Sequence, residues 1–66
     1  MSVSLQVYDF VRTTPGCLAY AEAFRSNEID GEALLLLKEE HLMQAPISMK
    51  LGPALKLSAR IEEHRV

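Results

Sequence analysis

Apolar residues recur at helical spacing along most of this chain, and they predict a series of short amphipathic helices. The apolar face of the first helix consists of Val3, Val7, Phe10 and Val11. Ser4 is a plausible N-cap, because its hydroxyl can accept a hydrogen bond from a free backbone N–H. This helix should end near Thr13, since the residue before Pro15 is disfavoured in the helical region.

Turn residues separate the middle elements. A second helix is expected from about Pro15 or Gly16 to Asn27, and its inward-facing residues are predicted to be Cys17, Leu18, Ala21 and Phe24. Asp30 can cap a short third helix over Gly31 to Leu36, where its carboxylate also suits the helix dipole. A fourth short helix should run from Lys38 or Glu39 to Gln44 and end before Pro46.

Pro53 determines where the last and longest helix begins. Proline is tolerated only in the first turn of a helix, so the N-cap is expected at Lys50 or close to it. Lys50, Lys56 and Arg60 are left for solvent or a partner. The buried stripe is predicted to contain Leu51, Ala54, Leu55, Leu57, Ser58 and Ile61.

Strand signals are weak, because Ala, Leu, Glu and Lys predominate over β-branched residues. The expected fold is all-α, with five helices in a single domain over residues 1–66 and a core of about residues 4–64. A chain of 66 residues buries only about 60% of its unfolded surface, so a deep substrate cleft is not expected. Function should therefore reside on the surface.

Composition indicates a soluble intracellular domain. Even the longest apolar runs, such as Ala33 to Leu37, are far shorter than the roughly 20 residues that span a bilayer. The N-terminus has no basic region followed by an apolar one, so no signal peptide is predicted. Cys17 is the only cysteine and cannot form an internal disulfide; a core position in a reducing compartment fits it best.

The net charge of −2 argues against extensive contacts with nucleic-acid phosphates. The distribution of charge along the chain is more informative about partners than this sum. Residues 22–40 carry a balance of −4, and the chain from His41 onward carries +2. One such cluster would usually be a solvated face, but two clusters of opposite sign favour association between molecules.

No catalytic, metal or cofactor site is predicted. His41 and His64 lack zinc-like spacing with any third ligand except Cys17. Glu39 and Glu40 diverge from His41 on a helix, so they cannot converge on one reacting atom. Pro53 also deprives the segment around Gly52 of an N–H that a phosphate-binding loop would need. The methionines at positions 1, 43 and 49 are expected to fill gaps in the core.

Three segments together are specific: Ile29 to Leu37 (IDGEALLLL), His41 to Met43 (HLM) and Lys50 to Lys56 (KLGPALK). They resemble the sterile alpha motif (SAM) family, and within it the SAM domains of Polycomb-group proteins such as polyhomeotic and Sex comb on midleg. The resemblance covers roughly residues 7–63. Two features depart from it: the usual tryptophan before the first helix is absent, with Ser2 near its place, and the loop from Met43 to Lys50 is longer and contains Pro46.

The resemblance implies a five-helix domain that associates with itself, or with related SAM domains, through two surfaces. The first, the mid-loop surface, would comprise Glu28, Asp30, Glu32, Leu36, Leu37, Glu39 and Glu40. The second, the end-helix surface, would comprise Lys50, Leu51, Gly52, Pro53 and Lys56. Leu51 is the expected apolar centre of the contact. The resemblance also implies a nuclear scaffold in a chromatin-associated transcriptional repressor.

Two alternatives remain open from the sequence. Some SAM domains bind RNA hairpins through a basic patch, but here that patch would hold only Lys50, Lys56 and Arg60 beside acidic residues. Alternatively, one of the two surfaces is blunted, and the domain only dimerises or caps a partner's polymer. A membrane or a small-molecule substrate is not an expected partner.

Overall fold

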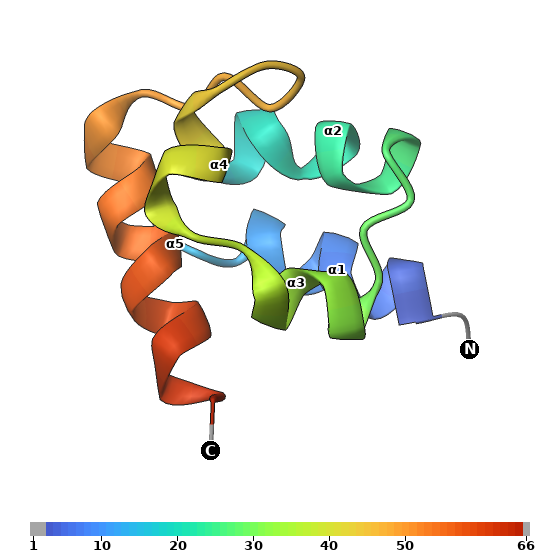
Figure 1. The fold of residues 1–66 in the computed structure, drawn as a ribbon. Coiled ribbons are helices and arrows are strands. Elements are labelled where there is room, and N and C mark those ends of the chain that lie inside the picture. The colour runs from blue at the N-terminus through green and yellow to red at the C-terminus, as the bar shows by residue number, and fades with distance from the viewer. Residues whose placement is uncertain (1–2, 66) are drawn as a thin grey trace.

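The computed structural model describes residues 3–65, with side chains from Gln6 to Arg65. Within that range it contains helices and turns and no strand, which confirms the all-α, five-helix fold. The helices are α1 (Val3–Arg12), α2 (Ala21–Ser26), α3 (Gly31–Leu36), α4 (Glu39–Met43) and α5 (Leu51–Glu63), with a 3₁₀ turn η1 (Leu18–Tyr20) before α2. No helix in the described range is long and apolar enough to cross a membrane. The long helix α5 flanks one side of the shorter helices (Figure 1).

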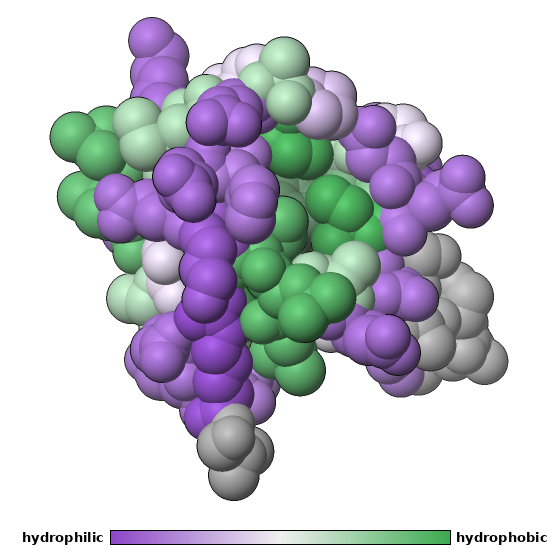
Figure 2. Space-filling view, in the orientation of Figure 1, coloured by the Kyte–Doolittle hydropathy of each residue, from purple (hydrophilic) through white to green (hydrophobic). Residues whose placement is uncertain are grey.

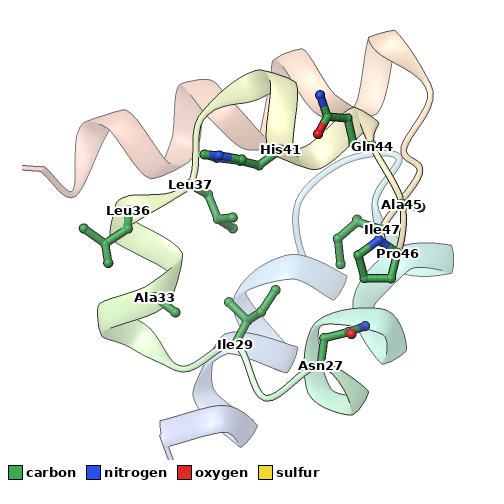
Figure 3. Close-up of a pocket in the computed structure, with 10 residues that line it drawn as sticks. All are labelled: Asn27, Ile29, Ala33, Leu36, Leu37, His41, Gln44, Ala45, Pro46 and Ile47. Atoms are coloured by element: carbon green, nitrogen blue, oxygen red, sulfur yellow. The ribbon is translucent and has the colours of Figure 1, made fainter.

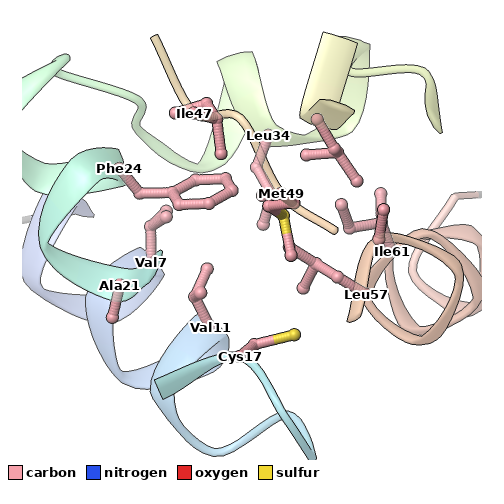
Figure 4. Close-up of a cluster of buried hydrophobic side chains, with 12 residues drawn as sticks. Val7, Val11, Cys17, Ala21, Phe24, Leu34, Ile47, Met49, Leu57 and Ile61 are labelled. Atoms are coloured by element: carbon pink, nitrogen blue, oxygen red, sulfur yellow. The ribbon is translucent and has the colours of Figure 1, made fainter. Parts of the chain in front are cut away.

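One hydrophobic core joins all five helices (Figure 4). The prediction of inward-facing residues is confirmed for Val7 and Val11 in α1, Cys17, Ala21 and Phe24 around α2, and Ala54, Leu57 and Ile61 in α5. Val3 has no described side chain, so its predicted packing lies outside the described residues, as does Met1. The predicted core role holds for Met49 but is wrong for Met43, which is 41% exposed.

Helix termini largely follow the local signals. Asp30 caps α3 as predicted, since its Oδ1 accepts the Ala33 N–H at 2.8 Å. Lys50 is the N-cap of α5, which places Pro53 in the first turn. The prediction for Ser4 is wrong: α1 begins at Val3, so Ser4 lies inside its first turn. Ser2, noted in place of the expected tryptophan, lies outside the described residues.

The second helix begins later than predicted, and Leu18 does not face inward. Residues 13–16 form turns, with Gly16 in the left-handed region at φ 80°, and only the 3₁₀ turn precedes Ala21. The tighter 3₁₀ winding breaks the 3.6-residue register that placed Leu18 on the Phe24 face, and its side chain is 67% exposed.

The buried stripe of α5 is narrower than predicted. Leu51 and Leu55 are 53% and 47% exposed. They lie one turn apart on the same side of the helix, which is therefore only partly covered. Ser58 is half-buried, so the fully buried stripe reduces to Ala54, Leu57 and Ile61.

The sequence left Arg60 for solvent or a partner, and this prediction is wrong. Its Nη1 donates to the Phe10 carbonyl oxygen at 2.7 Å and to the Thr14 hydroxyl at 2.8 Å, and its guanidinium lies 4.2 Å from the centre of the Phe10 ring. The last carbonyls of a helix lack intrahelical partners, and a cation suits that end of the dipole. Arg60 therefore caps the C-terminus of α1.

The loop that contains Pro46 is attached to the core. Ile47 and Met49 are buried, and the Met49 N–H donates to the Leu42 carbonyl oxygen at 2.8 Å. The Lys50 N–H then donates to the Tyr20 hydroxyl at 3.3 Å. These contacts position the start of α5 against α4 and η1.

Candidate protein-interaction surfaces

The predicted mid-loop residues come from two segments of the chain. Residues 28–32 form the connection from α2 into α3, and residues 36–40 run from the end of α3 into α4. Leu36 is 70% exposed, Leu37 and Glu39 are half-buried, and the other four predicted residues are exposed. These carboxylates and leucines are thus available at the surface of the domain.

Glu28 occupies a backbone conformation that usually selects glycine. Its φ is 57°, and it follows the end of α2. The N–H of Glu28 donates to the Arg25 carbonyl oxygen at 3.1 Å, and that of Ile29 donates to the Phe24 carbonyl oxygen at 3.0 Å. This hydrogen-bond pattern ends the helix with a left-handed residue, a position where a side chain strains the backbone.

The connection between α3 and α4 is held by two side chains that were not predicted as site residues. The Lys38 N–H donates to Nδ1 of His41 at 2.9 Å, which caps α4. The reciprocal bond of a capping box does not form, since a lysine ammonium has no acceptor. Arg65 donates to the Leu35 carbonyl oxygen at 3.0 Å and also to that of Leu37.

An apolar hollow of about 440 Å³ lies beside these residues (Figure 3). The side chains of Ile29 and Leu37 point into it. The sequence did not reveal this hollow, because its walls come from the α2–α3 connection, α3, α4 and the loop after α4. Its lining residues are Asn27, Ile29, Ala33, Leu36, Leu37, His41, Gln44, Ala45, Pro46 and Ile47.

The end-helix surface is formed by the first turn and a half of α5. Lys50, Leu51, Gly52 and Lys56 are exposed, and Pro53 is half-buried. The N–H groups of Leu51 and Gly52 belong to the first turn and have no intrahelical acceptor, so they suit an anionic partner. A Cβ added at Gly52 would meet nothing within 4 Å. Figure 2 shows apolar surface over the start of α5 and a second apolar area around the hollow.

Cys17 lies beneath this surface and supports it. The thiol is fully buried, and its Sγ is 3.5 Å from the Pro53 carbonyl oxygen. Burial raises the pKa of the Cys17 thiol, and the charge of Lys56 lowers it to a lesser extent. The thiol is therefore protonated at neutral pH, as suits a core residue.

The two surfaces do not neutralise each other within one molecule. Among residues 3–65 the salt bridges join Asp9 to Arg12, Glu22 to Arg25 and Glu62 to Arg65, and none includes a residue of either surface. The start of α5 lies at one edge of the domain, and the connection from α2 to α3 lies at the opposite edge (Figure 1).

Comparison with known proteins agrees with this architecture. The family model for the SAM domain (sterile alpha motif) matches residues 4–65. Polyhomeotic-like protein 2 of Xenopus laevis is 69% identical over 55 residues, which cover 83% of this chain and 16% of that protein. Polyhomeotic-like protein 1 of Homo sapiens is 62% identical over 56 residues, which cover 85% of this chain and 6% of that protein.

A solved structure described as a polyhomeotic SAM domain superposes with a TM-score of 0.88 at 49% identity, covering 96% of this chain and 89% of the other. The curated relatives are thus much longer than this chain, whereas the solved domain has nearly its length. The chain belongs to the sterile alpha motif family and is homologous to the polyhomeotic SAM domain.

Proposed function

We propose that this chain is a non-enzymatic protein-interaction module that binds copies of itself, or related SAM domains, head to tail. In this contact the mid-loop surface of one molecule meets the end-helix surface of the next. The observation that carries the proposal is that two exposed surfaces of opposite charge have no salt bridge between them among the described residues. Because the surfaces differ, the contact is heterologous, and its repetition without closure produces an open filament.

The apolar residues complement the charges. Leu51 and Leu55 are the exposed apolar residues at the start of α5, and the hollow beside the mid-loop surface has apolar walls. Insertion of Leu51 into the neighbour's hollow would desolvate both, while Lys50 and Lys56 would meet carboxylates around the rim. Interface energy is typically concentrated in such a few central, desolvated positions.

Two residues lower the stability of the isolated domain relative to the alternatives, which supports an intermolecular role for them. Glu28 is strained at φ 57°, where glycine would be relaxed. Gly52 lies in a helix with open space around its Cβ position, where alanine would favour the helix. If a neighbour binds at these positions, the Glu28 carboxylate can pair with a positive charge of the neighbour. The absence of a side chain at Gly52 allows the neighbour's backbone to approach closely.

The likeness to the relatives supports a proposal about the biological setting. On the likeness to polyhomeotic-like proteins, we propose that the domain acts in the nucleus as a scaffold element of a chromatin-associated transcriptional repressor.

A mixing experiment tests the two-surface contact. Light scattering on the wild type should show size rising with concentration and falling with salt, because exposed charge pairs are screened. Leu51→Arg and Leu36→Arg should each block large assemblies, and their mixture should form a heterodimer of bounded size, since each retains the surface that the other lost. A mixture that stays monomeric would contradict the proposal.

A further inference from the structure

The peptide group between Leu37 and Lys38 lies in the mid-loop surface, and ionisable side chains hold both of its polar ends. Its carbonyl oxygen accepts from Arg65, and its N–H donates to Nδ1 of His41 at 2.9 Å. This peptide joins two helices of only six and five residues. Helices this short have little stability of their own, so these bonds help to orient Leu36, Leu37, Glu39 and Glu40.

The two bonds differ in their response to pH. Nδ1 of a neutral imidazole can accept a hydrogen bond, but both nitrogens of a protonated imidazole are donors. Protonation of His41 therefore abolishes its bond to the Lys38 N–H. The Arg65 bond persists, because a guanidinium does not lose its proton in proteins.

We propose that His41 is a positioning residue: its neutral form holds the mid-loop surface in its binding conformation, and its protonation weakens the head-to-tail contact. The inference rests on the proposed function, and it assigns to that contact a control by pH. Histidine is the side chain whose charge ordinarily changes between about pH 5 and 8.

The other charged groups lie on α4 and on the elements near it. No other residue that lines the hollow is ionisable, and no salt bridge to His41 occurs among the described residues. The charged groups to consider are Lys38, Glu39 and Glu40 on α4, Glu28, Asp30 and Glu32 on the α3 side, and Lys56, Arg60, Glu62, Glu63 and Arg65 on or after α5, which packs against α4.

Protonation also acts directly on the contact. It adds a positive charge to a surface that is proposed to receive Lys50 and Lys56 of the neighbour. Loss of the cap and repulsion between like charges act in the same direction, so acidification should weaken assembly.

The chain offers a matched pair of variants. His41→Gln retains an acceptor that can cap the Lys38 N–H, since glutamine serves at this position of a capping box, but it does not titrate in this range. His64→Gln removes the only other histidine, which packs edge-on against Phe10 with ring centres 5.2 Å apart. Sedimentation of both variants separates the effect of His41 from general effects of acid.

Between about pH 7.5 and about pH 5.5 the dissociation constant of wild-type assembly should rise about fivefold, the equivalent of one hydrogen bond. Most carboxylates have a pKa of about 4 and stay ionised there. His64→Gln should show the same rise, and His41→Gln should reduce it to less than about twofold. An undiminished rise in His41→Gln would overturn the inference.

A second measurement does not depend on assembly. In monomeric Leu51→Arg, the amide resonance of Lys38 should shift with the titration of the His41 ring, and His41→Gln should abolish that shift. If the Lys38 amide resonance does not shift as the His41 ring titrates, the inference is overturned even if the wild type assembles. Failure of the wild type to assemble at about pH 7.5 would instead refute the proposed function.

Discussion

The end-helix and mid-loop surfaces are built in different ways. The end-helix surface comes from one continuous stretch of a 13-residue helix whose opposite face is buried through Ala54 and Leu57. The mid-loop surface comes from two segments around helices of six and five residues. Bonds from Asp30, His41 and Arg65 hold these segments in place. Substitutions at the end-helix surface should therefore change binding without changing its shape, whereas those at the mid-loop surface can change both binding and shape.

The largest effect is expected for Leu51→Arg. Because Leu51 is 53% exposed, the monomer should remain folded. Loss of a central apolar side chain from an interface commonly costs about 2 kcal/mol or more, so assembly should weaken by roughly 30-fold or more. Sedimentation velocity measures this directly.

Leu18→Arg is the matched control, since Leu18 is 67% exposed and belongs to neither surface. It should assemble like the wild type. Alkylation of the buried Cys17 thiol should stay slow in both variants, which verifies that the packing under Pro53 is intact. Unchanged assembly of Leu51→Arg would contradict the role of the end-helix surface.

At Asp30, the two functions of a mid-loop residue can be separated. Asp30→Ala removes the cap on the Ala33 N–H and should lower the free energy of unfolding by about 1 kcal/mol. Asp30→Asn retains a capping oxygen, so its stability should stay close to that of the wild type, but assembly should weaken by about two- to threefold through loss of charge.

Chemical denaturation and sedimentation of both Asp30 variants provide the comparison. If Asp30→Asn assembles as tightly as the wild type, the carboxylate acts on shape alone.

Glu28→Gly should have opposite effects on folding and on assembly. Relief of the left-handed strain at φ 57° should stabilise the monomer by about 0.5–1 kcal/mol. Loss of the carboxylate should weaken assembly by about twofold. Thermal unfolding of the dilute monomer measures its stability, and light scattering at higher concentration measures assembly. A Glu28→Gly variant that is more stable and also assembles more tightly would exclude Glu28 from the contact.

Gly52→Ala is the corresponding test on the end-helix surface and should have only a small effect on stability. A Cβ at this position meets nothing within 4 Å, so the helix should gain about 0.5 kcal/mol. If a neighbour approaches this turn closely, the added methyl group should weaken assembly. Equal assembly of Gly52→Ala and the wild type, seen by sedimentation, would show that the neighbour does not approach Gly52.

Signals that act over a few residues predicted much of the fold. Asp30 and Pro53 positioned the starts of α3 and α5, because capping and the missing proline N–H operate within a single turn. Helical spacing also identified most of the core, including Phe24 and Leu57. The end-helix surface could be proposed from sequence for the same reason, since its residues are consecutive.

Helical spacing could not predict whether a side chain is exposed or bonded where contact with another element decides it. It shows that Leu51 and Leu55 share a side of α5, but not that this side stays about half exposed. It also left Arg60 for solvent, although Arg60 bonds to the carbonyl oxygen of Phe10, 50 residues away in the sequence.

The sequence by itself determined the helical class, the positions of most helix ends and the opposite charges of two segments, because these depend on local backbone chemistry and on residue type. The tertiary structure alone decided which leucines remain exposed, that an apolar hollow lies beside the mid-loop surface, and that His41 and Arg65 hold the peptide between α3 and α4. These features arise from contacts between segments distant in the chain, and no local pattern specifies which distant groups will meet.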